Sequence, residues 1–280
     1  MKIVDFPGLN PGEWLNYYVL GTTFTSLPTG TGLAYSLNTI KIDSETDYMF
    51  LRTNHWMTQN HIVDVFLKYQ DDTSGRQLGK SAGLLRAISS QSETLDSLAY
   101  DFRAMQWREP FRIAAATTFT VQAANFNSSI SPNLYLSFHG GKVFKGIAPH
   151  KIPGVQKIPY YYTLPNSSST LPEGMINIGA NASYQTSIPI GNDGSFLCQA
   201  ISGFSTGECT IMITEGARDS NWFNQPVHFR TIVGSGGVPN VLPVPRLTRK
   251  TTSIGITLLD LSGASNNIQL TFMGKKLLGV

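Results

Sequence analysis

Apolar and polar residues alternate with a period of two along most of the chain, which is the pattern of half-buried β-strands. In the first half, this alternation predicts strands at residues 39–42, 48–52, 62–69, 118–123 and 134–138. In the second half, it predicts strands at residues 185–190, 196–200, 209–214, 228–233, 253–258 and 268–272. Turn-forming runs such as Gly191-Asn192-Asp193-Gly194 separate the strands. The chain is therefore predicted to be almost wholly β-structured.

One helix is predicted, in the first half of the chain. Ser90-Gln91-Ser92-Glu93 has the spacing of a capping box. After it, apolar residues recur at helical intervals up to Met105. We expect this helix to cover an open end of a β-sandwich, and the alternative is that it binds a partner.

Two matches within the sequence indicate a duplicated unit. Tyr17-Tyr18-Val19-Leu20 matches Tyr161-Tyr162-Thr163-Leu164, and each run is followed by a Leu-Pro pair. Later, Arg112-Ile113 and Phe138-His139-Gly140-Gly141-Lys142 match Arg246-Leu247 and Phe272-Met273-Gly274-Lys275-Lys276. The second shift is smaller than the first, so the first copy carries an insertion, which the predicted helix accounts for. Gly140 and Gly274 are expected where a strand leaves its sheet.

These matches set the expected domain boundaries. Residues 1–14 form an N-terminal arm, 15–146 the first β-sandwich unit, 147–158 a linker and 159–280 the second β-sandwich unit. The linker contains Pro149, Pro153 and Gly154, which cannot extend a sheet. The predicted fold class is all-β, with two tandem sandwich or barrel units and one short helix inserted in the first.

Charge and hydropathy narrow the range of partners. The net charge is +3, and the basic residues are scattered singly apart from the groups Arg246, Arg249, Lys250 and Lys275-Lys276. A protein that recognises a nucleic-acid sequence concentrates basic residues on one face, so we expect no sequence-specific nucleic-acid binding. The chain has neither a cleavable signal nor an apolar run of about 20 residues, so we expect neither export nor a transmembrane segment.

Candidate catalytic and metal-binding residues do not form a recognisable set. The five histidines, His55, His61, His139, His150 and His228, lack the spacing of a metal site, although a ligand pair of His55 and His61 is an alternative. Gly-x-Ser-x-Gly does not occur. Asp71-Asp72 is expected to cap a turn, with a calcium site as the alternative. We therefore expect no enzyme activity, no cofactor and no metal.

The two cysteines, Cys198 and Cys209, lie in predicted strands. Their apolar surroundings favour free, buried thiols, and a disulfide across a hairpin is the alternative. Free thiols are typical of a protein made in a reducing compartment.

The aromatic residues allow two interpretations. Tyr160-Tyr161-Tyr162, Trp56, Trp107 and Trp222 could stack on sugars, which would make the chain a carbohydrate- or receptor-binding module of a virion tail or spike. Large rings more often fill sandwich cores or subunit contacts. We therefore keep sugar binding as the alternative function.

Two tandem β units on one chain without a catalytic set resemble the double jelly-roll coat proteins of viruses. The run Asn266-Asn267-Ile268-Gln269-Leu270-Thr271-Phe272, followed by Gly274-Lys275-Lys276-Leu277, also resembles structural proteins of tailed bacteriophages. The resemblance covers most of both units. It implies jelly-roll-like sandwiches and a non-enzymatic virion component, most simply a major or minor capsid protein that is made in the host cytoplasm and assembles into the virion.

The expected partners follow from that resemblance. They are other copies of the chain, with a trimer as one candidate assembly, and other capsid or virion proteins. The candidate interface residues are Arg112, Arg246, Arg249, Lys250, Trp56 and Trp222. The two matched arginines, Arg112 and Arg246, are expected to tie the edge of a unit to a neighbouring loop or subunit. Basic residues near the C-terminus could face encapsidated nucleic acid or an acidic neighbour.

Overall fold

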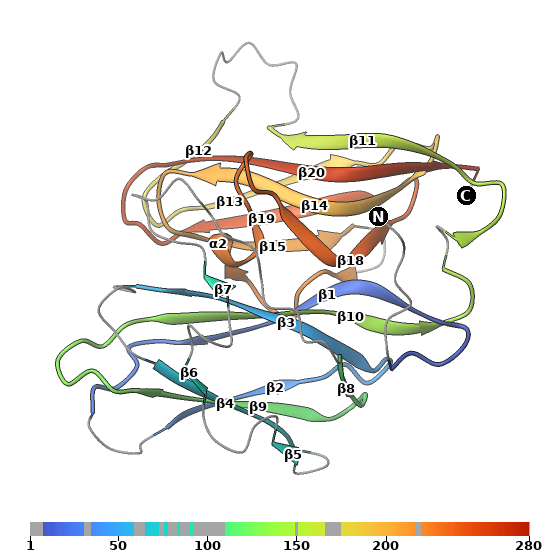
Figure 1. Cartoon of the computed structure of the whole chain (residues 1–280). Coiled ribbons are helices and arrows are strands. Elements are labelled where there is room, and N and C mark those ends of the chain that lie inside the picture. Colours follow the sequence, from blue (N-terminus) through green and yellow to red (C-terminus); the bar gives the residue numbers. More distant parts are fainter. Residues whose placement is uncertain are drawn as a thin grey trace.

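The computed structural model describes residues 8–30, 35–58, 65–72, 76–77, 83–84, 90–91, 110–148, 151–165, 175–216 and 220–279. These residues form four β-sheets, which pair into two β-sandwiches. Figure 1 shows the sandwiches stacked, with the N-terminal half of the chain below and the C-terminal half above.

The first sandwich is built from sheets A and B. Sheet A has the order β1 (Glu13–Phe24), β10 (Leu134–Lys145), β3 (Tyr48–Met57) and β7 (Ser90–Gln91), with β8 (Phe111–Ile113) also paired to β3. Sheet B has the order β2 (Ser36–Lys41), β9 (Thr118–Asn125), β4 (Val65–Asp71) and β5 (Arg76–Gln77), with β6 (Gly83–Leu84) also paired to β4.

The second sandwich is built from sheets C and D. Sheet C has the order β11 (Gln156–Leu164), β20 (Asn266–Leu278), β14 (Ser195–Ser205) and β18 (Asn240–Thr248), and β12 (Ile176–Ile178) also pairs with β20. Sheet D has the order β13 (Ser183–Pro189), β19 (Ser253–Asp260), β15 (Cys209–Glu215) and β16 (Ser220–Asn221). Here β17 (Val227–His228) also pairs with β15 and leads into the short helix α2 (Phe229–Ile232).

Both sandwiches have the strand order of a jelly roll. In each, the first and last long strands are neighbours, as β1 and β10 are in sheet A and β11 and β20 in sheet C. The second long strand of each unit pairs with the last but one long strand in the opposite sheet, as β2 does with β9 and β13 with β19. This double-sheet order is that of jelly-roll domains. The predicted all-β class with two tandem jelly-roll-like units is confirmed, and both units are open sandwiches rather than barrels.

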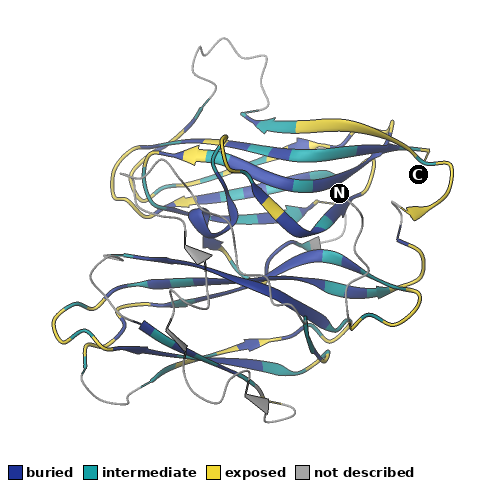
Figure 2. Cartoon of the chain, in the orientation of Figure 1, coloured by how far each residue is buried: buried dark blue, intermediate teal, exposed yellow. Residues whose placement is uncertain are grey.

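Sheet A is buried on both faces. One face carries Tyr18, Phe50 and Phe138, which pack against sheet B in the core of the first sandwich. The other face carries Tyr17 and Met49, which belong to the core cluster of the second sandwich. Every position of β3 is buried, and Figure 2 shows the same continuous burial along the middle of the molecule. The two units therefore share a core across the outer face of sheet A.

The same irregularity occurs at the same place in both units. The register of β10 against β3 shifts between His139 and Gly140, and the register of β20 against β14 shifts beside Gly274. A Cβ atom at Gly140 would overlap the carbonyl oxygen of Met49, and one at Gly274 would overlap that of Leu197. The expectation that these glycines mark strand ends is wrong, because both lie inside long strands, at β-bulges where only glycine fits.

Two local expectations also change. The strand predicted at 228–233 is instead the two-residue strand β17 followed by helix α2. At the start of the predicted helix, Ser90–Gln91 form strand β7, which runs parallel to β3. The remainder of that helix prediction lies outside the described residues.

Candidate functional site: the buried contact between the two sandwiches

The chemically distinctive side chains gather where the second sandwich rests on the outer face of sheet A, a region we call the inter-unit interface. Its apolar part is formed by Leu15, Tyr17, Val19, Met49 and Leu51 of the first unit, which join the second unit's core. These residues follow the alternation of strands β1 and β3, whose other face packs on sheet B. Strands β1 and β3 therefore have two apolar faces, one that packs on sheet B and one that packs on the second unit.

Backbone hydrogen bonds join the units directly. The amide of Val19 donates to the carbonyl oxygen of Trp222 at 2.9 Å, and the amide of Asn224 donates to the carbonyl oxygen of Val19 at 3.2 Å. The side-chain amide of Asn224 also donates to the carbonyl oxygen of Gly21 at 3.2 Å. The edge of β1 is thus paired by the segment that follows β16, which removes an exposed strand edge.

Thr231, in helix α2, is the centre of a buried polar network. Its carbonyl oxygen accepts hydrogen bonds from Asn54 Nδ2 at 2.9 Å and from His139 Nε2 at 3.0 Å. Its hydroxyl lies 2.6 Å from the hydroxyl of Ser137 and donates to the carbonyl oxygen of His228 at 2.7 Å. The short helix thus presents one carbonyl group to two strands of sheet A, β3 and β10. In a β-strand, the same carbonyl group would be used for pairing within its own sheet.

His139 is held as a neutral imidazole. Its Nδ1 lies 2.8 Å from the hydroxyl of Tyr17, and its Nε2 donates to Thr231. This assignment follows because a carbonyl oxygen only accepts, so Nε2 carries the proton and Nδ1 accepts from the tyrosine. Burial, reinforced by the positive charge of Arg52, lowers the pKa of His139 well below 6.5. Both ring nitrogens are satisfied without a charge.

His228 lies in a stack of rings. The Trp56 ring is parallel to it, with centroids 5.4 Å apart and an interplanar angle of 9°, and Tyr135 contacts it at 4.8 Å. The guanidinium of Arg230 lies 4.6 Å from the centroid of the Trp56 ring. Burial, together with the charge of Arg230, lowers the pKa of His228 well below 6.5. Among the residues that the structure describes, neither ring nitrogen has a hydrogen-bond partner, so protonation would place an uncompensated charge here.

Arg246 crosses the inter-unit interface from strand β18. It is 1% exposed, and its guanidinium donates to the carbonyl oxygen of Tyr17 at 3.0 Å. It pairs with the buried carboxylate of Glu215 at 3.5 Å and lies 5.5 Å from the Trp222 ring centroid. Burial lowers the pKa of Arg246 to about 10, so the side chain is charged at neutral pH. Removing one member of such a pair leaves the other charge buried without compensation.

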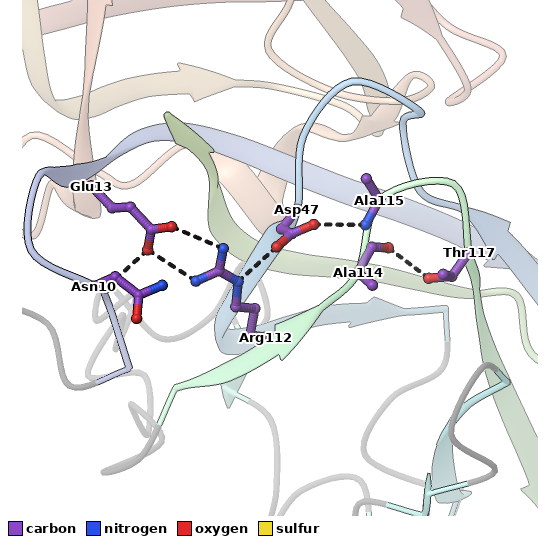
Figure 3. Close-up of polar contacts among 7 residues, drawn as sticks. All are labelled: Asn10, Glu13, Asp47, Arg112, Ala114, Ala115 and Thr117. Carbon is purple, nitrogen blue, oxygen red and sulfur yellow. Dashed lines mark hydrogen bonds and ion pairs between the residues drawn. The ribbon is translucent and has the colours of Figure 1, made fainter. Parts of the chain in front are cut away.

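Arg112, matched to Arg246 in the sequence, has a different position. Its guanidinium donates to both carboxylate oxygens of Glu13, at 2.9 and 3.1 Å, and its Nε donates to Asp47 at 2.7 Å (Figure 3). Asp47 in turn accepts from the amide of Ala115 at 2.9 Å. The hydrogen bonds from Arg112 lower the pKa of Glu13 to about 2. Arg112 therefore ties the start of β1 and the turn before β3 to strand β8.

The predicted interface residues separate into two groups. Trp56, Trp222 and Arg246 are buried inside the chain, at 6%, 0% and 1% exposure, so they join the two units and cannot contact another molecule. The suggestion that Trp56 and Trp222 stack on sugars is therefore wrong. Arg249 and Lys250 are exposed at the turn between β18 and β19, while Arg112 is partly exposed. Trp107 lies outside the described residues.

Sequence reasoning missed several members of the inter-unit interface. They are Arg52, whose guanidinium donates to Asn240, together with Asn54, Ser137, Thr231 and Asn224. One signal was available: Arg52 and Asn54 interrupt an apolar run. A strand with polar residues on the face opposite its core residues either faces solvent or meets a polar partner. The alternation alone does not distinguish these two cases.

The remaining candidate residues are the two cysteines, Asp72 and any group that could bind a metal. Cys198 and Cys209 are both buried free thiols, as expected, and burial raises the pKa of Cys209 to about 12. Asp72 accepts hydrogen bonds from the hydroxyls of Thr118 and Thr120. Within the described ranges, no three His, Cys, Asp or Glu residues are grouped as metal ligands would be. None of the helices in that part of the chain has the length and hydropathy to cross a membrane.

Comparisons with known proteins add little. No family model and no curated protein matches the chain. Among solved structures, the chain aligns with the N-terminal CBM22-1–CBM22-2 tandem domain from Paenibacillus barcinonensis Xyn10C at 6% identity, covering 98% of this chain and 95% of that one. The TM-score is 0.17, and a similarity this weak carries no argument about fold or function.

Proposed function

We propose that this protein is a non-enzymatic structural component of a bacteriophage virion, a capsid or capsid-associated protein that self-assembles through its β-sandwich units. The observation that carries the proposal is the jelly-roll strand order in two tandem units of one chain. Jelly rolls occur in viral capsids, lectins and cupins. Fold alone does not decide among these, and the resemblance of the strand endings to phage structural proteins favours the first.

The inter-unit interface supports this proposal. A shell subunit has to hold its shape while large surfaces are buried against neighbours. Here the two sandwiches are fixed to each other by a shared apolar core, by backbone pairing at Val19 and by the network at Thr231. The chain can therefore act as one building block with two similar halves. Its partners would be further copies and other virion proteins, and its place would be the particle after synthesis in the host cytoplasm.

The test is the mass of the purified full chain by light scattering over a wide concentration range, with electron microscopy of the same samples. Regular assemblies are expected, and the protein is expected in purified particles by mass spectrometry. A chain that stays monomeric at every concentration and is missing from particles would contradict the proposal.

A second candidate is a carbohydrate- or receptor-binding module of a virion tail or spike. It retains one supporting observation, the exposed ring of Tyr161 in strand β11, which is 67% exposed. Glycan-array binding that is abolished by Tyr161→Ala and retained by Leu37→Ala, a variant of another exposed residue, would support this candidate. An array without binding would remove it.

A further inference from the structure

The outer face of sheet C is the structural counterpart of the outer face of sheet A. Strands β11, β20 and β14 occupy the places of β1, β10 and β3, and the bulges beside Gly274 and Gly140 align them. A contact that occurs in both units supports the alignment. Lys276 lies 4.8 Å from the ring centroid of Tyr160, and Lys142 lies 4.4 Å from that of Tyr18. In each pair, the tyrosine belongs to the first strand and the lysine to the last. Tyr18 therefore corresponds to Tyr160, two residues before Tyr162, with which the sequence match paired it.

On sheet A, one row of residues across the strands carries the second unit. Val19, His139 and Arg52 lie directly opposite one another in β1, β10 and β3. All three are buried, and each is hydrogen-bonded to the second unit, Val19 to Trp222, His139 to Thr231 and Arg52 to Asn240. This row, next to the bulge, is the point at which sheet A receives a sandwich.

The equivalent row on sheet C is exposed at both of its ends, at Tyr161 and Val241. Tyr161, Met273, Ala200 and Val241 lie directly opposite one another across β11, β20, β14 and β18. Directly opposed residues point to the same face, so the row is continuous and wholly apolar apart from the tyrosine hydroxyl. Tyr161 is 67% exposed and Val241 49%, whereas Val19 and Arg52, in the equivalent row of sheet A, are buried. Figure 2 shows β11 exposed over much of its length.

We propose that this row, the sheet C face, binds the first unit of a second copy of the chain. The proposal rests on the self-assembly proposed above and names the surface that carries it. Within one chain, the second unit meets sheet A through the edge strands β18 and β16 and through β17 with α2. The corresponding edge of the first unit is formed by β8, paired to β3, and by β5 and β6, paired to β4. A second copy would place that edge on the sheet C face.

The contact is therefore heterologous, because a face of the second unit meets an edge of the first. Repeating it joins further copies head to tail, in a ring where the rotation closes. Tyrosine and methionine are enriched in protein interfaces. An exposed apolar row is typical of a protein-binding surface, and the equivalent row on sheet A is covered by the second unit.

Tyr161→Asp and Val241→Asp test the surface, since both side chains are exposed and neither change disturbs the core. The control is Leu37→Asp, which places the same charge at a 58% exposed leucine in β2. With the wild-type chain assembling, we expect the association constant of the contact to fall ~10-fold in each sheet C variant, which corresponds to 1.4 kcal/mol. The control should assemble as the wild type does, and all chains should unfold at the same urea concentration.

Two outcomes separate this inference from the proposed function. Sheet C variants that assemble as well as the wild type overturn the inference and leave the function standing, whereas a wild-type chain that never assembles overturns the function itself. The orientation is tested with a photo-crosslinking amino acid at position 161 in the assembled full chain. Crosslinks to peptides of the first unit are expected, and crosslinks confined to the second unit would overturn the head-to-tail arrangement.

Discussion

Single buried histidines make the molecule sensitive to pH. The pKa values of His139 and His228 are lowered well below 6.5 by burial and by the nearby charges of Arg52 and Arg230. Well above pH 6.5 both histidines are neutral whether the chain is folded or unfolded, so they do not affect the pH dependence of stability. Below it, the unfolded chain binds protons that the folded chain does not, and stability falls as the pH falls.

We therefore expect the free energy of unfolding to decrease between pH 7.5 and pH 5.0, by up to about 2 kcal/mol at pH 5.0 for each histidine. His228→Phe keeps a ring between Trp56 and Tyr135 and removes the titrating group, so this variant should lose less stability than the wild type over that range, by up to about 2 kcal/mol. Urea denaturation at the two pH values measures the difference. Carboxylates such as Glu13, with a pKa of about 2, contribute at lower pH and do not interfere. Equal losses in both chains would contradict the assignment.

At the scale of single elements, the strand pairs at the bulges depend on glycine. Gly140→Ala places a methyl group against the Met49 carbonyl and the Tyr48 ring. Overpacking of this kind costs about 1–3 kcal/mol, so the urea midpoint should fall while the slope of the transition stays the same. The matched control is Gly236→Ala, because nothing lies within 4 Å of a Cβ atom there. A Gly140→Ala chain as stable as the control would show that β10 and β3 can separate without cost.

The elements also show how far the sequence predicts the fold. Alternation located most long strands because each has an apolar face on a sandwich core. It ended β3 at residue 52, whereas the strand runs to Met57, because Arg52 and Asn54 face polar groups of the second unit instead of apolar ones. It missed β1, β11 and β18. Strand β18 contains Pro243 and Pro245, and prolines are tolerated there because β18 is an edge strand of sheet C.

The interface residues were harder to predict than the strands. Trp56, Trp222 and Arg246 were selected as contact residues, but their partners lie in the other half of the same chain. The match between Arg112 and Arg246 carried no information about orientation: Arg112 is opposite Met49, which faces the second unit, whereas Arg246 is opposite Cys198, inside the second sandwich. Such positions depend on the packing of distant segments, which neither periodicity nor a short repeat specifies.

At the scale of the whole molecule, the inter-unit interface should hold the two halves together without the linker. Lys151, Ile152, Pro153 and Gly154 are all exposed, so a protease site inserted between Pro153 and Gly154 should be accessible and should leave both sandwiches intact. The cut exposes none of the shared apolar core, and separating the halves would expose the whole outer face of sheet A.

We therefore expect the two fragments to elute as one particle at pH 7.5 after complete cleavage, with the mass of the uncut chain. The same cut in a Val19→Asp chain should release the fragments more readily, because the substitution puts a charge in the apolar part of the interface, where Val19 is fully buried. Lowering the pH to 5.0 should also favour release, since protonation of His139 and His228 is easier once the halves separate. Fragments that separate at pH 7.5 without any substitution would mean that the linker, rather than the buried contact, keeps the two jelly rolls together, and the chain could not then serve as one rigid building block.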